Sequence, residues 1–114
     1  MNSNIGEKME ELQNVEHNLQ HMLSQRQTLE LEINEIKNAL SELESAKDEC
    51  YKIVGNIMVK SAPESLKSEL HEKSKIASLK LSSIEKQQSL LEKKSSELRG
   101  QINSSSSADN SKKK

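Results

Sequence analysis

The sequence predicts an all-α-dominated fold, in which two long helices form an antiparallel two-helix coiled coil with a β-hairpin between them. Apolar residues recur at heptad spacing on both sides of the centre, which predicts the two helices. Residues 51–60, YKIVGNIMVK, gather β-branched residues around a Gly-Asn pair and belong to no helical stripe, which predicts the hairpin. Because such a hairpin has no core of its own, we expect an oligomer assembled through the centre of the chain.

Composition favours a coiled coil over a globular domain. Of the 114 residues, 32% are apolar and 31% are charged, and Tyr51 is the only aromatic residue. Residues 1–50 carry eleven acidic and four basic side chains, whereas residues 51–114 carry seven acidic and thirteen basic ones. An acidic helix and a basic helix attract when they lie side by side, which favours the antiparallel arrangement. Both chain ends would then meet at one tip, with the hairpin at the opposite end.

Residues 1–50 form the first predicted helix, and its seam is regular over about five heptads. With Leu12 at position a, the seam comprises Leu12, Val15, Leu19, Met22, Arg26, Leu29, Ile33, Ile36, Leu40, Leu43, Lys47 and Cys50. The seam loosens toward the N-terminus, where Ile5 holds an a position but Lys8 holds the following d position. The sequence therefore predicts a coiled-coil helix with a weak end.

Residues 61–102 form the second predicted helix, which begins at a capping box, Ser61-Ala62-Pro63-Glu64. Its seam is weaker, since polar and small residues hold many positions: Leu70, Ser74, Ala77, Leu81, Ile84, Gln88, Leu91, Ser95, Leu98 and Ile102. Four apolar residues fall outside this stripe: Leu66, Ile76, Leu79 and Leu90. Residues 103–114, rich in serine and lysine, are expected to be a disordered tail.

The Gly55-Asn56 pair predicts a two-residue hairpin loop, with the positive φ of a type II′ turn at Gly55. This register pairs Val54 with Ile57, Ile53 with Met58, Lys52 with Val59 and Tyr51 with Lys60. Both faces of the ribbon are then largely apolar, so we expect subunit assembly to depend on Tyr51, Ile53, Val54, Gly55, Ile57, Met58 and Val59. The competing interpretation is a plain loop, which explains the Gly-Asn pair but not the apolar cluster around it.

These features together resemble the prefoldin β-subunit family, over nearly everything from Leu12 to about Ile102. The most specific match is residues 51–60, which is similar to the family segment Tyr-Lys-x-x-Gly-x-x-Leu/Met-Val/Ile-Lys. Residues 27–30 (QTLE) and 40–43 resemble the first helix of the family, and residues 84–87 (IEKQ) resemble the second. The chain departs from many relatives at Asn56, where proline is also common, and in its serine- and lysine-rich tail.

The resemblance implies an ATP-independent chaperone. In this family, two α-type and four β-type subunits share a β-barrel platform, and six coiled-coil arms capture non-native proteins and pass them to a group II chaperonin. A β subunit carries one hairpin and an α subunit carries two, so the single hairpin of this chain favours the β type. The partners to expect are a prefoldin α-type subunit, unfolded client proteins and the chaperonin.

The expected client-binding residues lie at the loose ends of the two helices: Ile5, Met9, Leu12, Leu98 and Ile102. Flexible methionine and aliphatic side chains at a fraying end give an adaptable apolar surface. The same residues also serve as the last layers of the seam, and the sequence leaves both roles open. A coiled-coil scaffold without client binding is the main alternative function.

Other functions have little support in the sequence. His17 and His21 are four residues apart, but they fall at solvent-facing positions with no third ligand nearby, so we expect no metal site. Cys50 is expected to pack as a small apolar residue. No phosphate-binding loop, catalytic triad or paired carboxylates occur, so neither an enzyme nor a cofactor is expected. Three terminal lysines are a poor nucleic-acid signal. No apolar run predicts a membrane helix or signal peptide, and a lone cysteine suits the cytoplasm.

Overall fold

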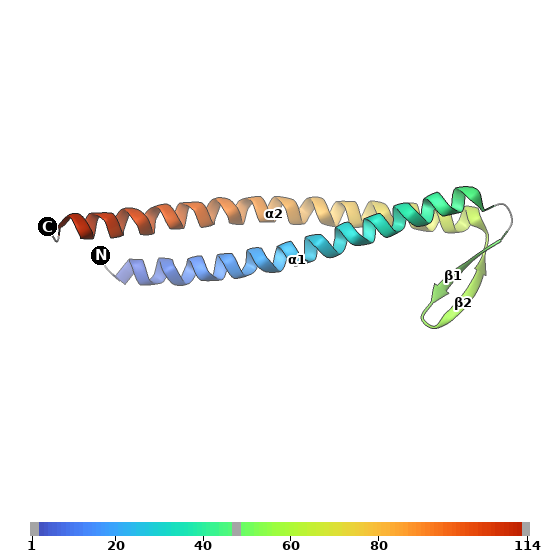
Figure 1. Ribbon diagram of the computed structural model, residues 1–114, viewed down its shortest axis with the longest axis horizontal. Coiled ribbons are helices and arrows are strands. Elements are labelled where there is room, and N and C mark those ends of the chain that lie inside the picture. Colours follow the sequence, from blue (N-terminus) through green and yellow to red (C-terminus); the bar gives the residue numbers. More distant parts are fainter. Residues whose placement is uncertain (1–2, 47–48, 113–114) are drawn as a thin grey trace. The chain divides into compact units, whose positions relative to one another are not determined.

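The computed structural model describes residues 3–46 and 49–112, which form two helices and two strands (Figure 1). Helix α1 spans Ser3–Ser45, strand β1 spans Cys50–Val54, strand β2 spans Ile57–Ser61 and helix α2 spans Pro63–Lys112. The chain divides into two compact units. We call Met1–Arg26 with Ser83–Lys114 the terminal unit, and Gln27–Ser82 the hairpin unit. Each unit contains a segment of α1 and a segment of α2.

The predicted seam is confirmed by burial. Every seam position in the described residues is buried or half-buried; Lys47 lies outside them. The most buried side chains of the terminal unit are Val15, Ser95 and Leu98, and those of the hairpin unit are Ile36, Leu43 and Ala77. None of the large side chains described is completely enclosed, because two helices cover one another along a single stripe only.

Charged residues flank the seam in the terminal unit. The Lys94 ammonium lies 2.8 Å from a Glu11 carboxylate oxygen, Arg99 pairs with Glu16, and Arg26 lies 3.7 Å from Glu85. The hydrogen bond to Glu11, followed by its charge, raises the pKa of Lys94. Two of the three pairs join an acidic residue of α1 to a basic residue of α2, as the excess of acids in the first half of the chain and of bases in the second half predicts. Because these groups are exposed, the pairs bias the pairing of the helices and contribute little stability.

The hairpin forms in the predicted register. Val54 pairs with Ile57, Ile53 with Met58, Lys52 with Val59 and Tyr51 with Lys60, and the ladder adds the pair Cys50–Ser61. Gly55 has a φ of +62°, and it alone has a positive φ among the described residues. The positive φ is therefore at the first turn position only, as a type II′ turn requires.

The element boundaries differ from the prediction at three places. Helix α1 ends at Ser45 rather than near residue 50, and the Ala46 amide closes its last turn by donating to the Leu43 carbonyl. Ser61 does not cap α2: it belongs to β2, and the Ala62 carbonyl accepts the first helical hydrogen bond, from Leu66. The extra strand pair accounts for both shifts, since it draws Cys50 and Ser61 into the sheet.

The third difference is the C-terminal segment, which was predicted to be a disordered tail from residue 103. Helix α2 instead continues to Lys112. No proline or glycine follows Gly100, and serine costs a helix only a few tenths of a kcal/mol per residue, so an established helix extends through this segment without a defined stop.

We expect Gly55→Val to open the hairpin. A Cβ atom at Gly55 would meet no other atom within 4 Å, so the cost comes only from the positive φ, about 1–2 kcal/mol for an L-residue and more for a β-branched one. Amide hydrogen exchange should show lost protection across the β1–β2 ladder. The matched control Asn56→Val should retain protection, because Asn56 has no positive φ. Equal loss at both positions would contradict the type II′ turn.

Candidate subunit-assembly site and chain-end cluster

The hairpin exposes its apolar side chains to an unusual degree. Ile53 is 73% exposed, Met58 67% and Ile57 66%. With the other exposed apolar residues of the two strands, they form what we call the hairpin patch: Tyr51, Ile53, Val54, Ile57, Met58 and Val59. These are the residues that the sequence assigned to assembly, together with the turn glycine. Such a dense apolar group on a small element is typical of an interaction surface.

Both faces of the ribbon contribute to this patch. The ladder pairs Val54 with Ile57 on one face and Ile53 with Met58 on the other. Within the described residues, the sheet consists of β1 and β2, so each strand is hydrogen-bonded to a neighbour on one side only. The outer edges therefore offer backbone N–H and C=O groups to further strands, beside apolar side chains that further strands would cover.

Two hollows lie between the hairpin and the helices of its unit. The larger, of about 620 Å³, is lined by residues of the hairpin, of α2 and of α1: Lys52, Ile53, Val54, Gly55, Leu66, Glu69, Leu70, Lys73 and Ala39. The other, of about 410 Å³, lies beside Cys50 and Tyr51. The hairpin is thus not packed tightly onto the helices, and its apolar residues stay largely uncovered within one chain.

Both lysines of the hairpin form ion pairs. The Lys52 ammonium donates to both carboxylate oxygens of Glu69, at 3.1 and 3.5 Å. Lys60 lies 2.6 Å from Glu49, which directly precedes β1. The hydrogen bond from Lys52 lowers the pKa of Glu69 most, followed by the charge of Lys52; Lys73, at 3.7 Å, lowers it further. Sequence reasoning missed the pair Lys52–Glu69, because no periodicity signals a contact between a strand and a helix turn.

The five residues predicted to bind clients all lie in the compact terminal unit. We call them the chain-end cluster: Ile5, Met9, Leu12, Leu98 and Ile102. Met9 is 51% exposed, whereas Leu98 is only 5% exposed and belongs to the seam. Ile5, Leu12 and Ile102 are half-buried. Exposure thus singles out Met9 as the member most open to a ligand.

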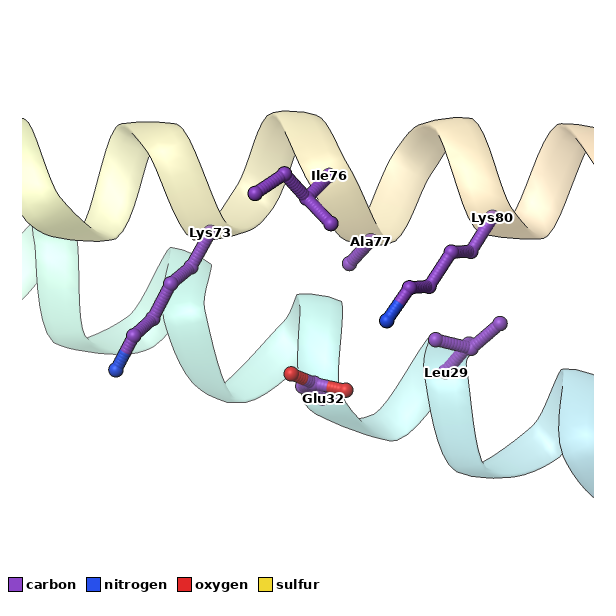
Figure 2. A pocket seen from close by; sticks show the side chains of 6 residues that line it. All are labelled: Leu29, Glu32, Lys73, Ile76, Ala77 and Lys80. Atoms are coloured by element: carbon purple, nitrogen blue, oxygen red, sulfur yellow. The ribbon is translucent and has the colours of Figure 1, made fainter.

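Apolar exposure is not confined to these two sites. Leu23 and Leu31 of α1, and Ile76, Leu79 and Leu90 of α2, also face solvent. A hollow of about 260 Å³ lies beside Ile76 and is lined by Leu29 and Glu32 of α1 and by Lys73, Ala77 and Lys80 of α2. Figure 2 shows these side chains. The charged groups that line the hollow, one carboxylate and two ammonium groups, are exposed to solvent. No buried polar side-chain atom in the described residues lacks a hydrogen-bond partner. The hollow therefore resembles a groove between helices more than a ligand site.

The histidine pair was predicted to be solvent-facing. His17 and His21 lie on the exposed side of α1 with their ring centroids 6.3 Å apart. Within the described ranges, no group of three metal-ligating side chains gathers that could hold an ion. In the same part of the chain, neither helix is long and apolar enough to cross a membrane.

The fold thus defines a class, the two-helix coiled coils whose helices are joined by an exposed apolar β-hairpin. A family model described as "Prefoldin subunit" matches residues 6–107, so the chain belongs to the prefoldin subunit family. Within the family it is similar to prefoldin subunit beta of Thermococcus kodakarensis, 36% identical over 96 residues that cover 82% of each chain. Prefoldin subunit beta of Saccharolobus islandicus is 34% identical over 84% of this chain and 78% of the relative.

A solved structure agrees with this relationship. The crystal structure of the prefoldin beta subunit from Thermococcus strain KS-1 matches with a TM-score of 0.82 and 34% identity, over 90% of this chain and 91% of that one. The resemblance to the β class seen in residues 51–60 is therefore confirmed. A role as a chaperone in protein folding follows from the family.

We expect Glu69 to titrate below the ordinary glutamate value of 4.5. Since its pKa is lowered in the folded chain, the stability that its ion pairs contribute is complete above 4.5 and is lost as the pH falls through the lower value. Side-chain carboxyl NMR should locate the titration of Glu69. In a Lys52→Met variant, in which only Lys73 remains beside Glu69, the titration should move toward 4.5. A titration that Lys52→Met leaves unchanged would contradict the assigned pair.

Proposed function

We propose that this chain is the β-type subunit of an ATP-independent chaperone hexamer, in which two α-type and four β-type subunits share a β-barrel platform. The observation that carries the assembly is the hairpin patch, with apolar side chains on both faces and two unpaired edges. Pairing those edges with neighbouring hairpins satisfies the backbone and buries the patch in one step. The relatives' β-subunit names support the choice of class.

In this proposal the chain-end clusters bind non-native proteins and pass them to a group II chaperonin. The exposed Met9 and the half-buried Ile5, Leu12 and Ile102 of the same unit offer apolar groups that bury little surface within the coil. Each captured apolar side chain contributes about 1–3 kcal/mol, so useful holding requires several arms to act together. Client binding therefore depends on assembly. The alternative is a scaffold subunit that does not bind clients, and experiment must distinguish it from the proposed chaperone.

The assembly step is tested by the double variant Ile53→Lys/Ile57→Lys. The two lysines lie on opposite faces of the ribbon, so barrel closure would bury at least one charge without a partner. We expect the oligomer with a prefoldin α subunit to be lost while the helical circular-dichroism signal persists. Leu31→Lys, at an exposed apolar position of α1, is the control and should assemble. An intact hexamer of the double variant in sedimentation would rule out the barrel.

The client-binding step is tested by Ile5→Gln/Met9→Gln/Ile102→Gln. Glutamine keeps the helix propensity and removes the apolar groups, and the buried Leu98 is left in place to preserve the seam. The assembled variant should suppress aggregation of a denatured protein much less than the wild type at equal concentration, without nucleotide.

The matched control for this experiment is Leu31→Gln/Leu79→Gln, which removes exposed apolar groups from the hairpin unit instead. It should protect the denatured protein as well as the wild type does. A scaffold role is indicated if neither the wild type nor the variants protect. Full protection by the triple variant would move the client site away from the chain ends.

A further inference from the structure

The two lysines of residues 51–60 are not explained by strand pairing. An apolar barrel needs the patch and the turn, whereas Lys52 and Lys60 bring positive charge to the same ribbon. Each of them makes an ion pair outside the ladder, with Glu69 and with Glu49. The pair Lys60–Glu49 stays local, because Glu49 is the residue before β1. The pair Lys52–Glu69 instead connects a strand to a different element.

The geometry of this second pair is specific. Lys52 lies in the middle of β1, across the ladder from Val59. Its ammonium contacts both oxygens of a carboxylate on α2, and the two side chains are 35% and 38% exposed. Glu69 is held in turn by Lys73, one helical turn further along. The carboxylate is therefore fixed between two ammonium groups, which restricts the positions that Lys52 can reach.

In the part of the chain that the structure describes, apolar packing between the hairpin and α2 is loose. Ala62 alone separates the end of β2 from the start of α2, so the angle between the ribbon and α2 is set across a one-residue connection. A hollow of about 620 Å³ lies where apolar packing would otherwise fix it, and Lys52 and Glu69 both line that hollow. The pair Lys52–Glu69 therefore links the hairpin to α2 at a place where apolar packing is loose.

We propose that Lys52 is a positioning residue: its ion pair with Glu69 sets the angle between the hairpin and α2, and this angle admits the hairpin to the assembled platform. The inference rests on the proposed function, since it assumes that the hairpin is the assembly element. A ribbon free to pivot must be ordered during assembly and loses entropy at that step, whereas a ribbon held at the assembly angle does not. Because the link is electrostatic and partly solvated, added salt should weaken it.

Two measurements test the proposal in the full-length chain. The first is the distance distribution between spin labels at Asn56→Cys and His71→Cys in a Cys50→Ser background, diluted with excess unlabelled protein; both sites belong to the hairpin unit. The second is the subunit concentration at which half of the chain assembles with a prefoldin α subunit, followed by native mass spectrometry. Lys52→Met and Glu69→Gln should broaden the distribution and raise the half-assembly concentration about two- to fivefold.

Two controls separate this role from a general loss of charge. Lys52→Arg keeps the ion pair and should behave as the wild type in both measurements. Lys67→Met removes a lysine that pairs with Glu64 within α2 and does not reach the hairpin, so it should also leave both unchanged. Added salt should broaden the wild-type distribution and leave that of Lys52→Met as it is.

The proposal is overturned if Lys52→Met leaves the distance distribution unchanged, or if it broadens the distribution while assembly stays normal. An assembly defect with an unchanged distribution also overturns it, since Lys52 would then act by contacting a neighbouring subunit. Failure of the proposed function has a different signature, because Ile53→Lys/Ile57→Lys would still assemble. If that double variant fails to assemble and Lys52→Met assembles normally, only the positioning role is lost.

Discussion

The rest of the structure depends on a β-hairpin that cannot bury itself. Two strands of five residues each provide one ladder, and their apolar side chains face outward on both sides. A two-stranded ribbon is marginal in water, and exposed edges of this kind invite further strands. The helices cannot relieve the constraint within one chain, because hollows rather than packed side chains separate them from the ribbon. In the proposed assembly, neighbouring subunits complete this local fold.

The coiled coil is held together by a narrow seam rather than by a core. Its seam is one stripe wide, and two of its most buried residues, Ala77 and Ser95, are small. The two helices therefore approach one another without forming a large core. Ion pairs such as Glu11–Lys94 select the antiparallel partner more than they stabilise it. A narrow seam leaves apolar side chains such as Met9 outside it. In the proposed function, the narrow seam that limits the stability of the coil also leaves these side chains available to client proteins.

Most of the fold could be predicted from the sequence, because its elements obey local rules. The heptad positions and the Gly-Asn turn predicted the buried stripe and the strand register, and both were confirmed. The ends of the elements were less predictable. Ser61 has the chemistry of a helix cap but was taken by one more strand pair, and a serine-rich segment that reads as disordered continues α2. The contact of Lys52 with Glu69 could not be predicted, since it depends on the angle of the ribbon.

Exposure at the hairpin also has a consequence for a copy that has no partners. Uncovered β-branched and aliphatic side chains beside open strand edges are the features by which cells distinguish damaged or half-made proteins from finished ones. An orphan copy of this chain carries them in its fully folded state. In the proposed assembly, its lifetime should then follow the supply of partner subunits.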